Sequence, residues 1–141
     1  MLVLDTNHGR EFAAGSEAGA RLRDRIGRGS DETATTIVCA EETLRGWLAE
    51  LHRLSNPHDQ IAAYRKLHER IEFFAAWLVL PWDSDAADRF IRLRRDGVRL
   101  GTMDLKIACI TLAHDATLLT RNTGDFAKVP GLKFGELAGL K

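Results

Sequence analysis

The chain contains 141 residues, of which 45% are hydrophobic and 28% are charged. These proportions are near the averages for globular domains, so disordered and fibrous classes are excluded. Lysine and arginine together number 20, as do aspartate and glutamate, which gives a formal net charge of zero. A strongly basic protein that coats nucleic acid is therefore excluded, and any contact with nucleic acid has to come from a local basic patch.

The length predicts a single domain over residues 1–141. No apolar run approaches the roughly 18–20 residues of a membrane span. Asp5 interrupts the apolar N-terminal segment, which argues against a signal peptide. The two cysteines, Cys39 and Cys109, are far apart and lie in apolar stretches. We therefore expect buried, reduced thiols and a cytoplasmic protein.

Four short apolar segments and a weaker fifth are typical of β-strands. They comprise residues 2–4, 35–39, 78–80, 117–120 and, most weakly, 132–134. Their hydrophobic residues are continuous rather than alternating. This pattern indicates strands of a parallel sheet that is covered on both faces.

Helical patterns separate these segments. The predicted helices span residues 17–26, 41–54, 58–76, 85–95 and 104–114. Strands that alternate with helices predict an α/β domain with a mostly parallel sheet. The pair of helices at 41–54 and 58–76, between the second and third strands, is more than one crossover needs. We expect this pair to form a small cap or a partner-binding surface.

Acidic residues follow the predicted strands, at the end of the sheet where ligands bind in open parallel folds. The set comprises Asp5 after the first strand, Glu41 and Glu42 after the second, Asp104 at the start of the most apolar helix, and Asp125 after the fourth strand. Each residue alone could be a turn or helix cap. Carboxylates gathered at one place repel one another unless they are protonated or neutralised. All-oxygen ligands select Mg²⁺ or Mn²⁺ over zinc, so the sequence predicts such a site.

The matching chemistry is phosphoryl transfer to metal-activated water. The chain has no GxxxxGK[ST] loop, no GxGxxG and no GxSxG motif, which argues against a P-loop, a dinucleotide site and a serine hydrolase. His8 is the one histidine expected near the site. A basic stretch close to Asp104 is either a solvated helix face or a patch that positions a phosphate backbone. It contains Arg89, Arg92, Arg94, Arg95, Arg99 and Lys106, and Arg121 lies beside Asn122.

Four blocks of sequence carry a family resemblance. They are Leu4-Asp5-Thr6-Asn7-His8, residues 36–47 with Glu42-x-x-x-Gly46, residues 101–108 with Asp104, and residues 119–132 with Asn122 and Asp125. In this order, the blocks resemble those of PIN domains, specifically the VapC-type ribonuclease toxins. The resemblance implies a three-layer α/β/α sandwich around a four- to five-stranded, mostly parallel sheet. It also implies an Mg²⁺- or Mn²⁺-dependent endoribonuclease, usually a homodimer, that a cognate VapB-type antitoxin inhibits.

Carried over residue by residue, the resemblance makes Asp5 and Asp104 the principal metal ligands and catalytic residues. Glu42 matches the glutamate of the second block through its spacing to Gly46, although helical periodicity alone places Glu41 nearer the apolar face.

In the fourth block, some relatives carry an aspartate where this chain has Asn122, which leaves the negative charge to Asp125. The residues expected to hold the carboxylates and the attacking water by hydrogen bonds are Thr6, Asn7, Thr120 and Asn122. Those expected to contact the RNA are Arg95, Arg99, Arg121 and His8.

Two other functions stay open from the sequence. Asn122 is compatible with a PIN-like module that binds RNA or a partner protein and has weak or lost catalysis. A haloacid dehalogenase-type phosphatase also begins with an aspartate after the first strand, but it needs a second aspartate where this chain has Asn7.

For the toxin interpretation, we expect an antitoxin helix, or a second subunit, to cover apolar surface of the helical pair. The candidate residues, most of them expected in the core, are Trp47, Leu51, Tyr64, Phe73, Phe74 and Trp77.

Overall fold

A five-stranded parallel sheet lies at the centre of the computed structural model, which describes residues 1–14, 16–29 and 31–136. The strands are β1 (Leu2–Leu4), β2 (Thr33–Thr36), β3 (Val79–Leu80), β4 (Thr117–Leu119) and β5 (Lys133–Gly135), in the order β3-β2-β1-β4-β5. The central strand β1 pairs with both β2 and β4, and all pairs are parallel. The carboxyl ends of the central strands therefore meet at one edge, as predicted.

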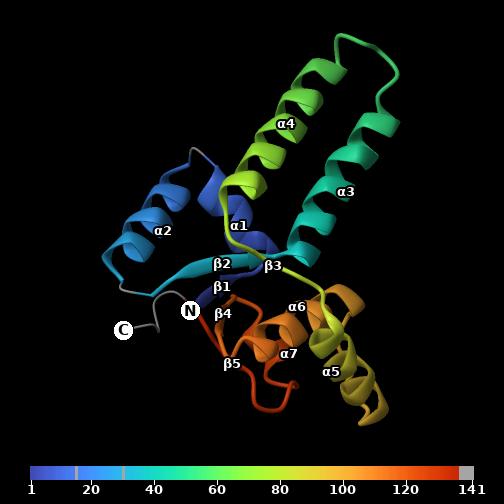
Figure 1. Cartoon of the computed structure of the whole chain (residues 1–141). Helices are drawn as coiled ribbons and strands as arrows, with labels where there is room; N and C mark the ends of the chain where they lie inside the picture. The colour runs from blue at the N-terminus through green and yellow to red at the C-terminus, as the bar shows by residue number, and fades with distance from the viewer. Residues whose placement is uncertain (15, 30, 137–141) are drawn as a thin grey trace.

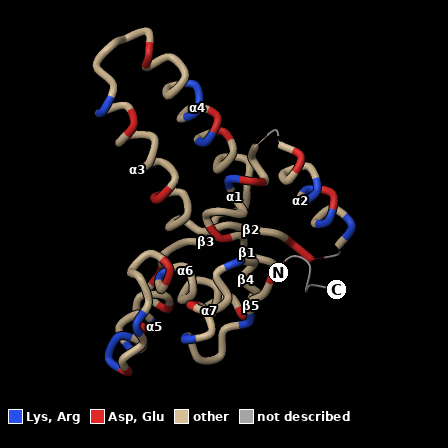
Figure 2. The backbone as a smooth tube through the Cα atoms, turned by 180° about the vertical axis from the view of Figure 1, so that it is seen from behind, with Lys and Arg blue, Asp and Glu red and all other residues tan. Residues whose placement is uncertain are grey.

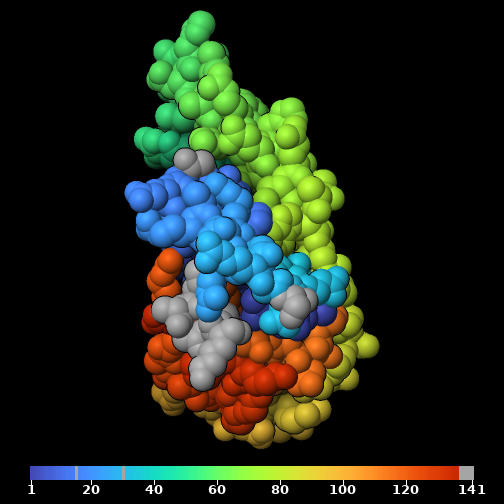
Figure 3. All heavy atoms as spheres, turned by 90° about the vertical axis from the view of Figure 1, so that its left-hand side faces the viewer, coloured from blue at the N-terminus to red at the C-terminus, as the bar shows by residue number. Residues whose placement is uncertain are grey.

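Helices cover both faces of the sheet (Figure 1). On one face lie α1 (Thr6–Ala13), α2 (Glu17–Arg28), α3 (Ile37–Arg53) and α4 (Gln60–Ala76); on the other lie α5 (Ser84–Arg95), α6 (Thr102–Ala113) and α7 (Thr123–Phe126). This arrangement confirms the three-layer α/β sandwich. The predicted helical pair is α3 and α4, which project from the rest of the molecule (Figure 3).

The second strand ends earlier than predicted. The segment 35–39 was expected to be a strand, but Ile37 begins α3 and only Thr35 and Thr36 belong to β2. The Thr36 hydroxyl accepts a hydrogen bond from the Cys39 backbone N–H at 3.1 Å and so caps the helix. A short buried apolar run has the same pattern in a strand and in the first turn of a buried helix, which explains the error.

Helix α1 was not predicted. It follows β1 directly, because Asp5 has extended backbone dihedrals and its side chain accepts a hydrogen bond from the His8 backbone N–H. Its eight residues include few apolar ones, so they give little periodic signal. Helix α1 is important for the site because it carries Thr6 and His8 next to Asp5.

Two apolar clusters fill the space on the two faces. Leu22 of α2 packs against Leu4 and Leu119 of the sheet. The larger cluster lies mainly on the other face, where α6 buries Leu105 and Ile107. Its buried side chains confirm that this helix is packed deep in the fold.

The two cysteines, Cys39 and Cys109, are buried and unpaired as expected. Burial raises the pKa of the Cys109 thiol to about 11, so this thiol is not a ready nucleophile. No helix in the described ranges is long and apolar enough to cross a membrane.

Candidate active site

Asp5 lies at the carboxyl end of the central strand and is held by several donors. One carboxylate oxygen, Oδ1, accepts the His8 backbone N–H at 2.9 Å and lies 2.9 Å from the His8 ring atom Nδ1. Burial opposes ionisation, but the hydrogen bonds from His8 and Thr120 outweigh it and hold the pKa of Asp5 below its usual value. Asp5 is therefore an ionised carboxylate in a fixed orientation.

His8 positions Asp5 from within the protein. Its side chain is 1% exposed, so the structure does not support the predicted contact of His8 with substrate. With Asp5 ionised, ring atom Nδ1 has to carry the proton that it donates to the carboxylate. The sequence placed His8 near the site but did not show that the first turn of α1 turns the ring inward.

Glu42, rather than Glu41, contacts the start of α1 next to Asp5. The Thr6 hydroxyl of α1 donates a hydrogen bond of 2.7 Å to Glu42 Oε1. Glu41 instead forms an exposed ion pair with Arg45 one turn along α3. The spacing to Gly46 had favoured the glutamate that makes this contact, and the predicted role of Thr6 in holding a carboxylate has a contact to support it.

The pKa of Asp104 is influenced by the charges of the other carboxylates. Burial is the largest cause of its raised pKa, and the negative charges of Glu42, Asp5 and Asp125 raise it further. Asp104, Glu42 and Asp125 come from α6, α3 and α7, and Asp5 lies between β1 and α1, so these four residues come from distant parts of the chain. We call the four carboxylates the acidic cluster.

Asp125 lies at the solvent-exposed side of the acidic cluster. Its carboxylate accepts a hydrogen bond from Asn122 Nδ2 at 2.9 Å and lies 3.3 Å from Lys128 Nζ. These two contacts, that of Asn122 first, lower the pKa of Asp125. Asn122 therefore orients Asp125, and Lys128 is a site residue that the sequence did not indicate.

Thr120 and Asn7 differ in how far the structure supports them. Thr120 is buried, its hydroxyl accepts the Asn122 backbone N–H at 3.0 Å, and a hydrogen bond from it lowers the pKa of Asp5. It therefore links β1 to the segment that carries Asp125. Asn7 is exposed on α1 and makes no side-chain hydrogen bond to any described residue.

The donor set suits a hard divalent cation, because it consists of carboxylate oxygens that repel one another. Among the described residues, no three acidic, histidine or cysteine side chains yet form a compact metal-binding group. Burial first, and then the negative charges of the other three carboxylates, raise the pKa of Asp104, and a bound cation would favour its ionised form. Charge and chemistry thus fit Mg²⁺ or Mn²⁺.

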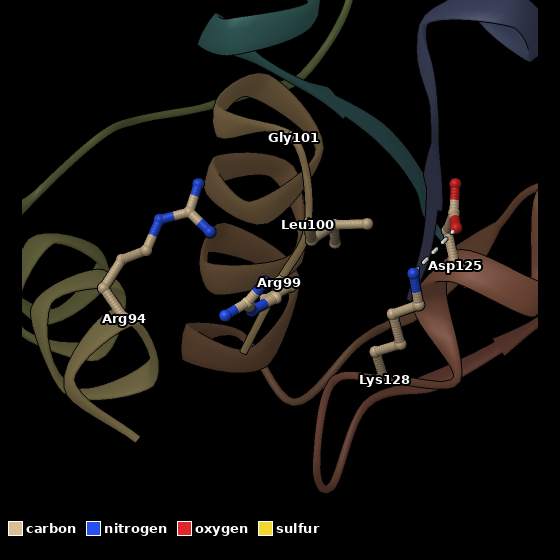
Figure 4. A pocket seen from close by; sticks show the side chains of 6 residues that line it. All are labelled: Arg94, Arg99, Leu100, Gly101, Asp125 and Lys128. Atoms are coloured by element: carbon tan, nitrogen blue, oxygen red, sulfur yellow. Dashed lines mark hydrogen bonds and ion pairs between the residues drawn. The ribbon is translucent and has the colours of Figure 1, made fainter. Parts of the chain in front are cut away.

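A basic pocket of about 440 Å³ adjoins Asp125 (Figure 4). It is lined by Arg94, Arg99, Leu100, Gly101, Asp125 and Lys128. Arg94 comes from α5 and also donates to the Val98 carbonyl oxygen at 3.0 Å, whereas Arg99 precedes α6. We call this the Arg94–Arg99 pocket, and its three cations can hold a phosphate beside the acidic cluster.

The other predicted cations lie elsewhere. Arg95 is exposed and does not line the Arg94–Arg99 pocket, so Arg94 takes the place expected for it. Arg121 forms a two-point ion pair with Glu11 of α1, with N–O distances of 2.6 and 2.8 Å. Arg89 is paired with Asp85. In Figure 2, basic residues gather at the end of α5, away from the red residues at the strand ends.

Comparisons with known proteins agree with this geometry. A family model described as PIN domain matches residues 2–132. No curated protein matches the chain by sequence.

Solved structures share the fold. A chain of VapBC-1 from nontypeable Haemophilus influenzae has a TM-score of 0.74 at 18% identity, and the match covers 97% of this chain and 98% of that one. A chain of DNA-bound VapBC from Salmonella typhimurium has a TM-score of 0.74 at 22% identity, with 96% and 97% covered. A chain of FitAcB from Neisseria gonorrhoeae has a TM-score of 0.70 at 20% identity, with 99% and 100% covered.

Proposed function

The chain belongs to the PIN domain family, and we propose that it is a divalent-metal-dependent endoribonuclease that acts as the toxin of a toxin–antitoxin pair. The observation that carries this proposal is the acidic cluster at the carboxyl end of a parallel sheet, in which burial and then the charges of three other carboxylates raise the pKa of Asp104. Such crowding of like charge is costly unless a cation is bound there. Similarity to VapBC structures supports the toxin assignment.

Asp5 and Asp104 are the proposed principal ligands of Mg²⁺ or Mn²⁺, with Glu42 and Asp125 completing the set. When bound, the cation supplies Lewis acidity that activates water and stabilises negative charge on the phosphate. His8 and Thr120 hold Asp5 in its ionised form. Thr6 engages Glu42 Oε1, which leaves Oε2 to orient the attacking water and accept its proton.

Cations at the surface are proposed to hold the RNA. Arg94, Arg99 and Lys128 line the pocket beside Asp125 and are placed to bind a phosphate near the acidic cluster. Arg95 and Arg121 remain proposed RNA contacts, but both lie outside this pocket and Arg121 would first have to release Glu11. Asn7 is exposed beside Asp5 and stays a proposed contact to the attacking water.

A cognate VapB-type antitoxin and a second subunit are the proposed protein partners, in the cytoplasm. The α3–α4 pair exposes Leu48, Ile61, Tyr64 and Ile71, each between 49% and 57% exposed. Of the apolar residues predicted for this role, Leu51 is buried, whereas Phe73 and Trp77 pack near Phe12. The exposed residues form an apolar face that an amphipathic partner helix can cover.

The test is cleavage of a pool of cellular RNA by the purified protein with Mg²⁺ or Mn²⁺. We expect discrete fragments that disappear with EDTA. Asp5→Asn should slow cleavage by about 1000-fold, because it removes a charged ligand worth several kcal/mol of charge stabilisation. The matched control is Asp24→Asn, which removes an exposed acid paired with Arg28 and should cleave normally.

The opposite outcome favours the binding module. RNA binding without cleavage, unchanged by either metal, would contradict the nuclease proposal. Cleavage that survives both EDTA and Asp5→Asn would contradict the proposed site, because it would come from different chemistry or from a contaminating enzyme.

A further inference from the structure

A second basic pocket, of about 450 Å³, lies between α1, α3 and α4, on the opposite face of the sheet from the Arg94–Arg99 pocket. It is lined by Arg10, Thr43, Gly46, Trp47, Glu50 and Arg70. We call it the α3–α4 pocket. The volume is in the range of pockets that hold a small organic ligand. Nothing in the proposed function so far uses it.

Two arginines of the α3–α4 pocket have no ion pair with any residue that the structure describes. Arg70 is half-buried, and its Nε is shielded from solvent without any hydrogen bond. Arg10 on α1 likewise has no ion pair with a described residue. Glu50 does not neutralise them, because its two carboxylate oxygens bind Arg53 at 2.5 and 3.1 Å. The pocket therefore presents two uncompensated guanidinium groups, which are suited to bind an anion such as phosphate.

Trp47 and Gly46 make the pocket fit a planar group beside that anion. Trp47 is half-buried and, unlike Phe12 or Trp82, has no aromatic partner in the described part of the chain. At Gly46, apart from its chain neighbours and the nearby backbone of α3, no atom lies within 4 Å of where a Cβ would stand, so the surface beside this glycine is open. Aromatic rings in such positions stack on nucleic-acid bases without regard to their sequence.

The α3–α4 pocket adjoins the acidic cluster. A smaller cavity shares Arg10, Thr43 and Arg70 with it and is also lined by Thr6, whose hydroxyl binds Glu42. Along α3, Gly46 follows Glu42 by one turn, a rise of about 6 Å. This distance is comparable with the spacing of successive phosphates along a nucleic-acid strand.

We propose that the α3–α4 pocket binds the nucleotide next to the cleaved phosphate: Arg10 and Arg70 hold its phosphate, and Trp47 stacks on its base. The inference rests on the proposed ribonuclease function and assigns part of its substrate site. RNA is favoured over a protein segment because Ile61, an exposed apolar residue suited to a protein, lies on the opposite side of α4 from Arg70.

The experiment measures binding of a fluorescein-labelled single-stranded RNA of about ten nucleotides, by anisotropy in EDTA, so that cleavage does not interfere. Salt is varied from about 50 to 200 mM. Arg70→Gln and Arg10→Gln should each weaken binding by about five- to tenfold and lower the slope of log K against log salt by about 0.7. Arg65→Gln, an exposed charge on the same helix outside the pocket, should change neither quantity.

Two further variants separate stacking from charge and from folding. Trp47→Ala should weaken binding by about fivefold without a change in salt slope, and Trp47→Phe should retain binding. Arg70→Gln removes a half-buried charge that has no ion pair with a described residue, so its Tm should equal or exceed that of the wild type. A large drop in Tm would instead assign Arg70 a structural role and overturn the proposal.

The outcomes also separate this inference from the proposed function. If the wild type cleaves and binds RNA but Arg70→Gln and Arg10→Gln keep its affinity and salt slope, only the pocket assignment fails. If the wild type neither cleaves nor binds RNA, the ribonuclease proposal fails and the pocket assignment fails with it. Binding of an acidic peptide that is lost in Arg70→Gln, with RNA binding unchanged, would reassign the pocket to a protein partner.

Discussion

The two ends of the acidic cluster are built differently. Asp5 is 8% exposed and receives hydrogen bonds from the backbone and ring of His8 and from Thr120. Asp125 lies at the surface, where its contacts are the side chains of Asn122 and Lys128. Both carboxylates have a lowered pKa, but the donors of Asp5 are buried and those of Asp125 are exposed.

Asp5 is therefore a preorganised ligand, whereas Asp125 is an adjustable one. A buried carboxylate without donors would be expensive, so the hydrogen bonds to Asp5 are required for folding as well as for function. Asp125 can exchange Lys128 for a cation or a substrate with little structural cost, because exposed ion pairs contribute only about 0–1 kcal/mol. We therefore expect substitutions around Asp5 to have larger effects than substitutions around Asp125.

After replacement of Asp5 itself, the largest effect should come from the ring of His8. In His8→Leu, the hydrogen bond from Nδ1 to Asp5 Oδ1 is lost, and we expect metal-dependent cleavage to fall by about 10- to 100-fold, as for other partners of metal ligands. His8→Asn keeps a donor near the position of Nδ1 and should recover much of the activity. Cleavage rates and Mn²⁺ titrations of folded variants provide the measurement. Equal losses in the two variants would show that packing, rather than the hydrogen bond, is what Asp5 needs.

A smaller effect is expected at the exposed end. Asp125→Asn should lower cleavage by less than about tenfold, because this carboxylate is solvated and already shared with Lys128. Asp115→Asn is a matched control, since Asp115 is an exposed acid 3.1 Å from Lys133 Nζ. Its backbone φ of 47° is one that asparagine tolerates. A loss in Asp125→Asn as large as that in Asp5→Asn would remove the distinction between the two ends.

The smallest effect concerns stability without metal. The pKa of Asp104 is raised in the folded protein, so between 3.8 and that pKa the native state binds more protons than the unfolded state. The free energy of unfolding therefore falls as pH rises through this window, and the cost persists at neutral pH. Solvent screens this partly exposed group, so we expect Asp104→Asn to raise Tm by only about 2 °C at pH 7 in EDTA.

This stability difference should shrink as the pH is lowered toward about 4, and Mg²⁺ should stabilise the wild type but not the variant. Asp85→Asn controls for the loss of an acid from the first turn of a helix. Because Asp85 is paired with Arg89, its replacement should not raise Tm. A lower Tm for Asp104→Asn in EDTA would contradict unrelieved repulsion in the acidic cluster.

Much of the fold could be predicted because hydrophobic patterning is local. The strand at Leu2–Leu4 and the deeply buried helix α6 were evident from continuous apolar residues. The boundary at Ile37 was not, because an apolar run of this length is compatible with either structure until Thr36 caps the helix. Helix α1 was missed for the opposite reason, since its stability comes from packing and a cap rather than from apolar periodicity.

The candidate site likewise has residues that could be predicted from the sequence and residues that could not. Sequence position after the strands predicted Asp5, Asp104 and Asp125, because parallel strands bring their carboxyl ends to one edge. The choice of Glu42 over Glu41 came from family spacing, and the structure supports it through Thr6. The sequence did not indicate Lys128 as a site residue, because a lysine after a helix is common on any surface.

By itself, the sequence determined the kinds of chemical group and the edge of the sheet at which they gather. Both follow from residue identity and from a periodicity that acts over a few residues. Only the tertiary structure decided that His8 turns inward to Asp5, that Arg94 replaces Arg95 beside Asp125, and that Arg70 Nε has no hydrogen bond to a described residue. Such choices depend on which helices pack together across the chain, because a side chain's burial and partners are set by neighbours that lie far away in sequence.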